Sequence, residues 1–397
     1  MLIELVEDIE GFRRLEPEWN AALKRSRNPS PFMTHEWLLS YLEVYAGAVD
    51  LFLVVARENS GIVGLAPLMI DDRKNLVFIG YPHNDYADII VVDDQVAAIE
   101  GICDLLLVQR HRWKKIILDQ MQEDLSHWKE ISSCLSKLSR PFRVLLSDSC
   151  PAMVLDDVKA ARKKYYKRNI TTYVNWYESQ GKLEFNTYNT REETLSRLED
   201  LFAQHIERRD QTPFPSQFNS DTVRRFYRQV IERMQPKSWV LLSSLTLDEK
   251  FLALYLAFHY NDTLYLYTTS FNGAYASRSP GQVILRYLFD YCGEHGIRRM
   301  DFARGGEGYK DRFANTVKQN RRIIIYRTGL AKTMANGFHA FRYSRLVDRI
   351  YRNQRSQAAI NAFLYSRRKE SLGKGLYKGL VALFTVRNRS VSRGGQD

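Results

Sequence analysis

The chain has 397 residues, of which 45% are hydrophobic and 12% aromatic, and it carries a formal net charge of +12. This apolar content supports large packed cores and predicts a globular protein rather than a disordered one. The length is sufficient for two or three ordinary domains.

The four cysteines show neither Cys-x-x-Cys spacing nor partnering histidines, and the eight histidines are scattered. The sequence therefore predicts no zinc site, no disulfide framework and no metal dependence, and a reduced compartment fits best. The first residues, MLIELVEDIEGF, are acidic where a secretory signal is basic, and no run of eighteen apolar residues occurs. We expect a cytoplasmic protein, with a peripheral position at the inner membrane face left open.

Residues 331–397 account for nearly all of the net positive charge, and we predict that they form a basic helical tail. Three interpretations remain open for this tail: solvated basic helices, association with an anionic membrane surface, and nucleic-acid binding. The membrane interpretation depends on an apolar stripe that a helix would carry beside its arginines. The stripe consists of Tyr343, Leu346, Val347, Ile350 and Tyr351.

The first 155 residues predict two helices followed by a hairpin, two strands, a helix and a strand. The aromatic residues of the second helix fall at helical spacing, which is typical of a core face. The expected helices are 12–24, 32–46 and 95–109, and the expected strands are 51–57, 62–70, 76–81, 87–92 and 114–120.

A similar order of elements recurs about 190 residues later, which predicts an internal duplication. At the place where the second half has Arg278-Ser-Pro-Gly-Gln, the first half has only Asp93 and Asp94, which would repel a phosphate. We therefore expect the first half to be a structural copy without a donor site. The loop His83-Asn84-Asp85-Tyr86 either faces a cleft shared by the halves or is a polar turn with no role.

Between the halves, residues 156–180 form the densest basic run outside the tail, with tyrosines and a tryptophan interleaved. Arg162 and Lys164 are candidates for binding an anionic substrate. A solvated helix whose aromatic side chains pack inward is the alternative.

The second half predicts two helices that cover a sheet, then a strand and an aromatic hairpin with a turn at Asn261-Asp262. A helix, a strand ending at Asp301 and a final strand follow. The expected helices are 191–209 and 220–234 and one beginning at residue 280. The expected strands are 238–247, 251–260, 263–271 and 321–327, and residues 296–302 are expected to form a turn and the strand that ends at Asp301.

The segment Arg278-Ser279-Pro280-Gly281-Gln282-Val283 has the composition of a helix start that binds phosphate. Ser279 suits the cap, Pro280 suits the first helical position, and Gly281 lets a ligand approach the backbone. The unpaired amides and the positive end of the helix dipole attract a pyrophosphate, and Arg278 adds a full charge. Ordinary helix capping is the alternative interpretation.

The stretch from Asp301 to Arg312 carries more chemical groups than a connecting turn needs. Asp301 ends a strand and is a candidate base or acceptor ligand, and Glu307 on the glycine-rich loop is the competing base. Lys310 and Tyr309 complete the catalytic candidates, and Arg304 and Arg312 are candidates for binding phosphate or carboxylate. A structural bridge from Asp301 to Arg304 or Arg312 is the alternative.

The series hairpin, Ser-Pro-Gly helix, strand ending D-F-x-R-G and then Y-K-x-R-F resembles the GNAT acyltransferases. Specifically, it is similar to the CelD/BcsL type of cellulose and exopolysaccharide biosynthesis, which is related to the FemAB peptidyl transferases. The resemblance covers about residues 1–330 and is most specific in 265–313. The usual GNAT phosphate loop, R/Q-x-x-G-x-G/A, is absent in that form, and Arg278-Ser-Pro-Gly-Gln stands in its place.

The resemblance implies an α/β fold with two tandem GNAT-like sheets, mixed but mainly antiparallel and flanked by helices. The implied divisions are a domain without a cofactor loop at 1–155, an acyltransferase domain at 156–330 and the basic tail at 331–397. It also implies that acetyl-CoA or another acyl-CoA serves as co-substrate. GNAT enzymes often use a water molecule in place of a dedicated base.

Three functions are compatible with these features. The first is an acyl-CoA-dependent N- or O-acyltransferase acting on a sugar, a sugar nucleotide or a related metabolite of surface-polysaccharide synthesis. The second is a FemAB-like transferase that uses aminoacyl-tRNA, and the third is an inactive GNAT scaffold that binds a partner in polysaccharide synthesis. No Ser-His-Asp order, H-E-x-x-H or G-x-x-x-x-G-K-S/T motif points to a common hydrolase, metalloprotease or P-loop NTPase.

Overall fold

The computed structural model describes residues 1–59, 61–137, 141–155, 168–210, 212, 215–305 and 308–326. The first half contains β1 (Leu2–Val6), α1 (Ile9–Arg14), α2 (Glu16–Lys24), η1 (Pro31–Met33), α3 (His35–Val44), β2 (Asp50–Glu58), β3 (Gly61–Ile70), β4 (Asn75–Phe78), β5 (Ile90–Val91), η2 (Val92–Asp94), α4 (Ala97–Val108), β6 (Lys115–Gln122), α5 (Trp128–Ser136) and β7 (Phe142–Val154). The second half contains α7 (Arg168–Gln180), β8 (Leu183–Tyr188), α8 (Arg191–Asp210), η3 (Gln217–Asn219), α9 (Asp221–Met234), η4 (Gln235–Lys237), β9 (Val240–Leu247), β10 (Lys250–Tyr260), β11 (Thr263–Phe271), η5 (Gly273–Arg278), α10 (Pro280–Glu294), β12 (Arg299–Asp301), α11 (Lys310–Phe313) and β13 (Thr316–Ile325).

Strands from both halves join one sheet of thirteen strands within the described residues. Its order is β1-β2-β3-β4-β6-β13-β7-β12-β11-β10-β9-β8, and β5 pairs with β3 beside this path. The pairs β4–β6 and β11–β12 are parallel, and the other pairs are antiparallel. This arrangement confirms the predicted mixed, mainly antiparallel α/β fold.

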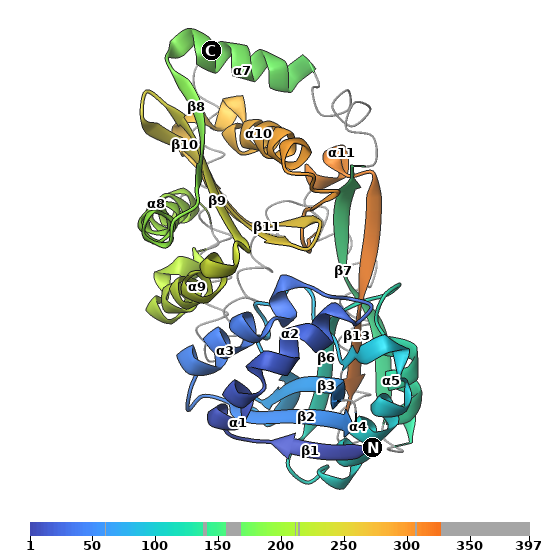
Figure 1. Cartoon of the computed structure of the whole chain (residues 1–397). Coiled ribbons are helices and arrows are strands. Elements are labelled where there is room, and N and C mark those ends of the chain that lie inside the picture. Colours follow the sequence, from blue (N-terminus) through green and yellow to red (C-terminus); the bar gives the residue numbers. More distant parts are fainter. Residues whose placement is uncertain are drawn as a thin grey trace, which may run out of the picture. The chain divides into compact units, whose positions relative to one another are not determined.

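The last described strand, β13, lies between two strands of the first half (Figure 1). Its residues 320–325 pair with β6, and the whole strand from Thr316 to Ile325 pairs with β7. The far end of β7 in turn pairs with β12 of the second half. The two halves are therefore connected by backbone hydrogen bonds between residues that are far apart in sequence.

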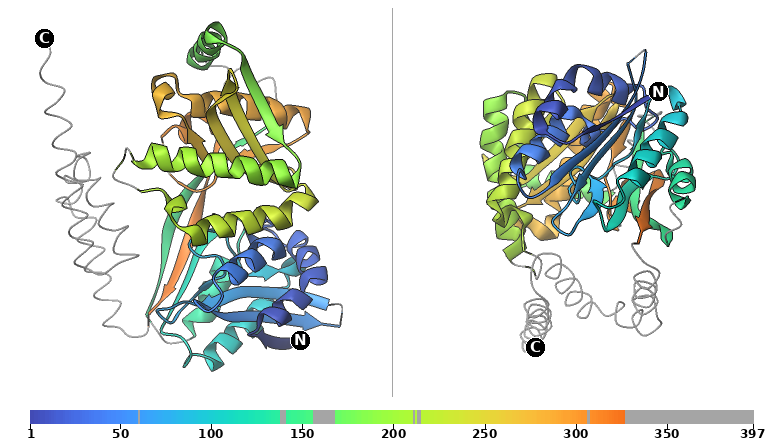
Figure 2. Two further views of the ribbon diagram at one scale, coloured as in Figure 1. Left: turned by 90° about the vertical axis from the view of Figure 1, so that its left-hand side faces the viewer. Right: turned by 90° about the horizontal axis from the view of Figure 1, so that it is seen from below.

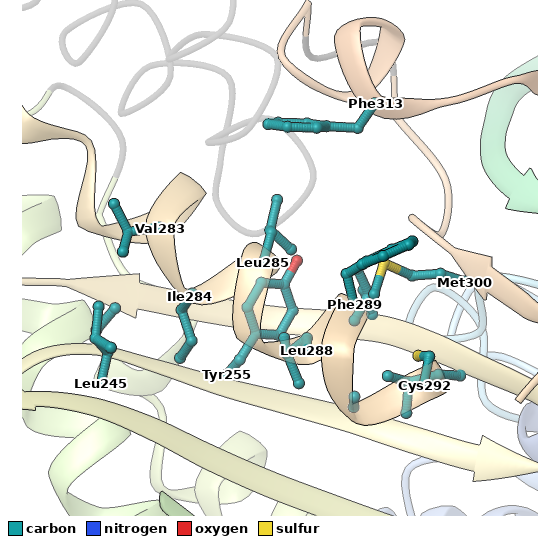
Figure 3. Packing of buried hydrophobic residues seen from close by; sticks show 14 of the residues in the cluster. Leu245, Tyr255, Val283, Ile284, Leu285, Leu288, Phe289, Cys292, Met300 and Phe313 are labelled. Carbon is teal, nitrogen blue, oxygen red and sulfur yellow. The ribbon is translucent and has the colours of Figure 1, made fainter. Parts of the chain in front are cut away.

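The core of the second half is built on the buried face of α10, which packs over β9, β10 and β11 (Figure 3). Five apolar residues at helical spacing lie on this face, and all five are buried. They are Val283, Leu285, Leu288, Phe289 and Cys292. Each buried apolar side chain contributes roughly 1.5–3 kcal/mol to the stability of the folded state. The packing of this face therefore holds α10, and with it the helix start, in place on the sheet.

Further helices include α3 in the first half and α8 and α9 in the second half. The aromatic stripe of α3 is core, as expected, with Trp37 and Tyr41 both buried. Helices α8 and α9 run next to each other (Figure 2), and Arg228 of α9 donates a hydrogen bond to Glu199 of α8.

Some segments differ from the sequence prediction. The strand expected at 87–92 shrinks to Ile90–Val91, because the Ala87 amide donates to the Gln120 carbonyl instead of extending the ladder. Strands β1, β7 and β8 and helix α5 were not predicted. In β7, a polar centre and Pro151 conceal the strand pattern.

The chain divides into two compact units. Residues 1–204 and 220–328 form the unit that contains the sheet. In the other unit, His205 Nδ1 lies 2.8 Å from Ser216 Oγ, and its ring packs on Phe218.

The predicted basic tail lies outside the described residues. Among the helices that are described, none has the length and apolar content needed to span a bilayer.

Candidate functional site

The start of α10 has the backbone geometry of a tight entry into a helix. Ser279 occupies the cap position in the left-handed region (φ 47°, ψ 53°), and Pro280 is the first helical residue, as the sequence predicted. The Ser279 side chain makes no capping hydrogen bond, while its carbonyl accepts from the amides of Gln282 and Val283. The Val283 side chain is fully buried in the core and its amide is already paired with Ser279, so Val283 offers a ligand no free donor, contrary to the prediction that it binds the donor.

Gly281 stands at the second helical position, where glycine costs stability relative to alanine. A Cβ added here would lie 3.4 Å from Phe271 Cδ1, which is ordinary contact, so neighbouring side chains do not require a glycine. A bare backbone at a helix start fits the close approach of a phosphate.

Arg278 precedes this helix start and is partly buried. Its guanidinium carbon lies 4.7 Å from the ring centroid of Trp176 on α7. Within the described residues, no carboxylate forms an ion pair with Arg278. Residues 278–283, which the sequence predicted to bind the donor, thus lie at one helix end, and a helix start beside an arginine suits a phosphate group.

Asp301 ends β12 and is buried, with its carboxylate accepting hydrogen bonds on both oxygens. The Tyr86 hydroxyl donates to Oδ1 over 2.6 Å, and the Ala303 amide donates to the same atom over 2.9 Å. Arg299 donates to Oδ2 from Nε at 3.3 Å and from Nη2 at 3.2 Å. Burial, with the Asp301 charge adding to it, raises the pKa of Tyr86 well above its usual value.

Arg304 pairs with Asp85, which reaches it from the first half of the chain. Arg304 Nε lies 2.7 Å from Asp85 Oδ1, and its Nη2 donates to the Pro82 carbonyl over 2.6 Å. Burial raises the pKa of Asp85 to about 6, although Arg304 and Lys310 oppose the shift. Lys310 is itself buried, and its ammonium donates to the Arg304 carbonyl over 2.8 Å.

A buried amide network holds the backbone of Asp85 in place. Asn320 of β13 is fully buried, and its side-chain amide donates to the Asp85 carbonyl and to Gln120 Oε1. Gln120 donates in turn to Asp148 Oδ2 over 2.6 Å. The strand that crosses from the second half thus supports the loop that presents Asp85.

The remaining predicted site residues have mixed positions. Tyr309 is partly buried and packs against the core of the second half, and Arg312 is exposed on α11. Arg162, Lys164 and Glu307 lie outside the described residues. The structure therefore brings together Asp301, Arg304 and Lys310 and leaves the other acceptor-side candidates apart or undescribed.

In the first half, the two aspartates that follow β5 form ion pairs with the segment after α2. Asp93 pairs with Arg25, and Asp94 pairs with Arg27. The carboxylates of η2, which precede α4, are thus neutralised by protein cations.

Sequence reasoning left Asp85 and Tyr86 undecided between a cleft position and a polar turn. Both are buried and contact the Asp301–Arg304 segment, a position that follows from the arrangement of the two halves. One signal was available in the sequence: a polar run, His-Asn-Asp-Tyr, between two apolar segments.

The arrangement supplies two chemical elements of group transfer. One is a helix end with a cation that suits a phosphorylated donor, and the other is a buried carboxyl with a pKa near neutrality beside two cations. Within the described ranges, no group of three or more His, Cys, Asp or Glu residues could hold a metal ion.

Part of the chain is similar to a known domain family, and the fold is similar to that of several solved structures. The model of the Acetyltransferase (GNAT) domain matches residues 164–311. No curated protein gives a significant match.

Solved structures with a similar fold share little sequence with the chain. The crystal structure of FemX has a TM-score of 0.57 at 12% identity and covers 84% of this chain and 99% of its own. A conserved protein of unknown function from Bacteroides thetaiotaomicron has a TM-score of 0.52 at 9% identity, with 82% and 100% covered. L-PGS from Bacillus licheniformis has a TM-score of 0.51 at 14% identity, with 80% and 94% covered.

The matched domain contains both the start of α10 and the strand that ends at Asp301. Residues 164–311 are therefore similar to GNAT acetyltransferase domains, and the fold of the chain is similar to that of FemX.

Proposed function

We propose that the protein is an acyl-CoA-dependent N- or O-acyltransferase. The observation that carries this proposal is the GNAT-domain match over residues 164–311, which contains the helix start at Arg278 to Val283. The acceptor class, a sugar, sugar nucleotide or related metabolite of surface-polysaccharide synthesis in the cytoplasm, rests on the CelD/BcsL resemblance alone.

In this proposal the start of α10 anchors the phosphates of the donor, and the thioester supplies the acyl group. The Gly281 backbone and the Arg278 guanidinium bind the donor, which places its thioester near the ends of the neighbouring strands. Asp85 takes the proton of the acceptor amine or hydroxyl, because a pKa of about 6 suits a base that works near neutral pH. Arg304 and Lys310 orient Asp85 and attract an anionic acceptor.

The test measures acetyl-CoA binding by calorimetry and thiol release with a panel of sugars and sugar nucleotides. We expect acetyl-CoA binding, and we expect Asp85→Asn to lower the transfer rate by about 10²-fold while leaving the Kd of acetyl-CoA unchanged. Asp72→Asn, on an exposed turn of the same half, is the control. A parent protein that binds no acyl-CoA contradicts the proposal, and full activity of Asp85→Asn contradicts the role of Asp85.

A transferase that uses aminoacyl-tRNA is the second candidate, favoured by the fold similarity to FemX and by the basic run at residues 159–168. Binding through that run predicts an affinity for tRNA that falls steeply with salt. Filter binding between 50 and 200 mM salt distinguishes the candidates. Tight, salt-dependent tRNA binding without acyl-CoA binding would replace the first proposal with this one.

A further inference from the structure

Helix α7 packs against α10 (Figure 1) and carries aromatic side chains that lie near the start of α10. Trp176 and Tyr177 pack against each other with ring centroids 5.1 Å apart. Tyr275 of η5 lies 6.5 Å from Trp176 and 5.9 Å from Tyr177. Three aromatic rings from two segments thus form one cluster next to residues 278–283.

Arg278 lies over the face of Trp176 in this cluster, with 4.7 Å between the guanidinium carbon and the ring centroid. A free arginine side chain samples many rotamers, and stacking on an aromatic face restricts it at little cost in hydration. Because no described carboxylate pairs with Arg278, the charge of the stacked guanidinium remains available to an anion.

Tyr177 provides an independent sign of an incomplete site. Its side chain is fully buried, yet its hydroxyl has no hydrogen-bond partner within the described residues. A buried hydroxyl without a partner costs free energy, so such groups commonly bind a water molecule or a ligand. The positive charge of Arg278 acts on this hydroxyl and partly opposes the rise in its pKa that burial causes.

We infer that Trp176 is a positioning residue for the donor: it holds the Arg278 guanidinium at the start of α10 for the phosphates of a nucleotide-linked thioester. This inference rests on the proposed acyl-CoA function and names the device that orients the donor. Trp176 acts through Arg278, so its effect depends on the phosphates of the donor and not on the thioester arm.

The experiment compares two probes, CoA by calorimetry and pantetheine, which lacks the nucleotide and its phosphates, by NMR titration. For Trp176→Leu we expect the Kd of CoA to rise about three- to tenfold and the Kd of pantetheine to stay unchanged. Trp176→Phe keeps an aromatic face and should give a smaller rise. It also keeps the test valid if the leucine variant does not fold.

Two further variants separate positioning from general packing. Trp239→Leu removes another tryptophan with a cation over its ring, Lys237 at 5.3 Å, and should leave the Kd of CoA unchanged. Combining Trp176→Leu with Arg278→Gln should weaken CoA binding no more than Arg278→Gln alone, because the tryptophan acts through that arginine.

The outcomes that overturn the inference differ from those that overturn the proposed function. A parent protein that binds no CoA overturns both. If the parent binds CoA, the inference alone is overturned by any of three results: an unchanged Kd in Trp176→Leu, an equal loss of pantetheine affinity, or additive losses in the double variant.

Discussion

Asp301 accepts hydrogen bonds from Tyr86, Ala303 and Arg299, so its carboxylate is committed on both oxygens. The sequence made Asp301 a candidate base or acceptor ligand, with a structural bridge to Arg304 or Arg312 as the alternative. The partner that the structure shows is Arg299, while Arg304 pairs with Asp85. A carboxylate with this set of partners acts first as an anchor for the loop that carries Arg304.

We therefore predict that Asp301→Asn lowers the free energy of unfolding by roughly 2 to 4 kcal/mol, because it leaves the Arg299 cation without its partner. Chemical denaturation measures this loss, and turnover per folded molecule is measured on the same sample. Asp311→Asn, at an exposed aspartate of the neighbouring α11, is the control. Unchanged stability with a lost rate would instead favour a catalytic role for Asp301.

Asp88 gives a second prediction at the same scale, through pH. Burial raises the pKa of Asp88 to about 8, although the Ile89 amide and Asn28 donate to its carboxylate. Between the unfolded pKa near 4 and this value, the folded state holds a proton that the unfolded state has lost. The stability of the parent therefore falls as the pH rises through this window, by up to about 1.4 kcal/mol per pH unit.

Asp88→Asn removes this dependence, because asparagine resembles the protonated acid and does not titrate. Relative to the parent, the variant should gain stability steadily from pH 5 to pH 8 in denaturation experiments. For Asp72→Asn, at an exposed position, the free energy of unfolding should change with pH in the same way as that of the parent. Parallel curves for Asp88→Asn would show that Asp88 keeps an ordinary pKa.

At the scale of elements, α10 has two faces with different tasks. Its buried stripe packs in the core of the second half (Figure 3), and its first turn presents the Gly281 backbone beside Arg278. A change at the first turn should therefore affect ligand binding without disturbing the packed face.

We predict that Gly281→Asp abolishes acyl-CoA binding, because a carboxylate would stand where the donor phosphates bind. The melting temperature should change little, since a Cβ here meets only Phe271 at 3.4 Å. Gly281→Ala, which adds the Cβ without the charge, is the matched control and should retain more binding. Calorimetry that gives the parent's Kd for Gly281→Asp would place the donor elsewhere.

At the scale of the whole molecule, β13 makes the two halves interdependent. In β7, residues 142–152 pair with β13, and residues 152–154 pair with β12. Residues 1–155 alone lack both neighbours of β7 and leave one edge of β6 unpaired. Open edges of buried strands favour aggregation over folding.

We expect residues 1–155, expressed alone, to aggregate or to be digested rapidly by protease, whereas residues 1–330 should fold. Size-exclusion chromatography, circular dichroism and limited proteolysis compare the two chains. Adding residues 310–330 as a separate peptide should increase protection if β13 is the missing strand. A monomeric, protease-resistant 1–155 fragment would show that the first half is an independent domain.

The sequence alone determined the class of fold, most of the helices and hairpins, and the helix start at Pro280. These features depend on local patterns: the apolar period of α10, the Asn261-Asp262 turn and the Ser-Pro-Gly order all act within a few residues. Local patterns determine which face of an element is buried. The same kind of pattern predicted helices and strands of the first half.

The tertiary structure alone decided which side chains meet. Tyr86 and Asp301 are 215 residues apart in sequence, and β13 reaches β6 across a similar separation. Such contacts depend on strand order and register, which no local period encodes. Arg278 illustrates both levels: its place before the helix is visible in the sequence, but its stacking on Trp176 appears only when α7 packs against α10.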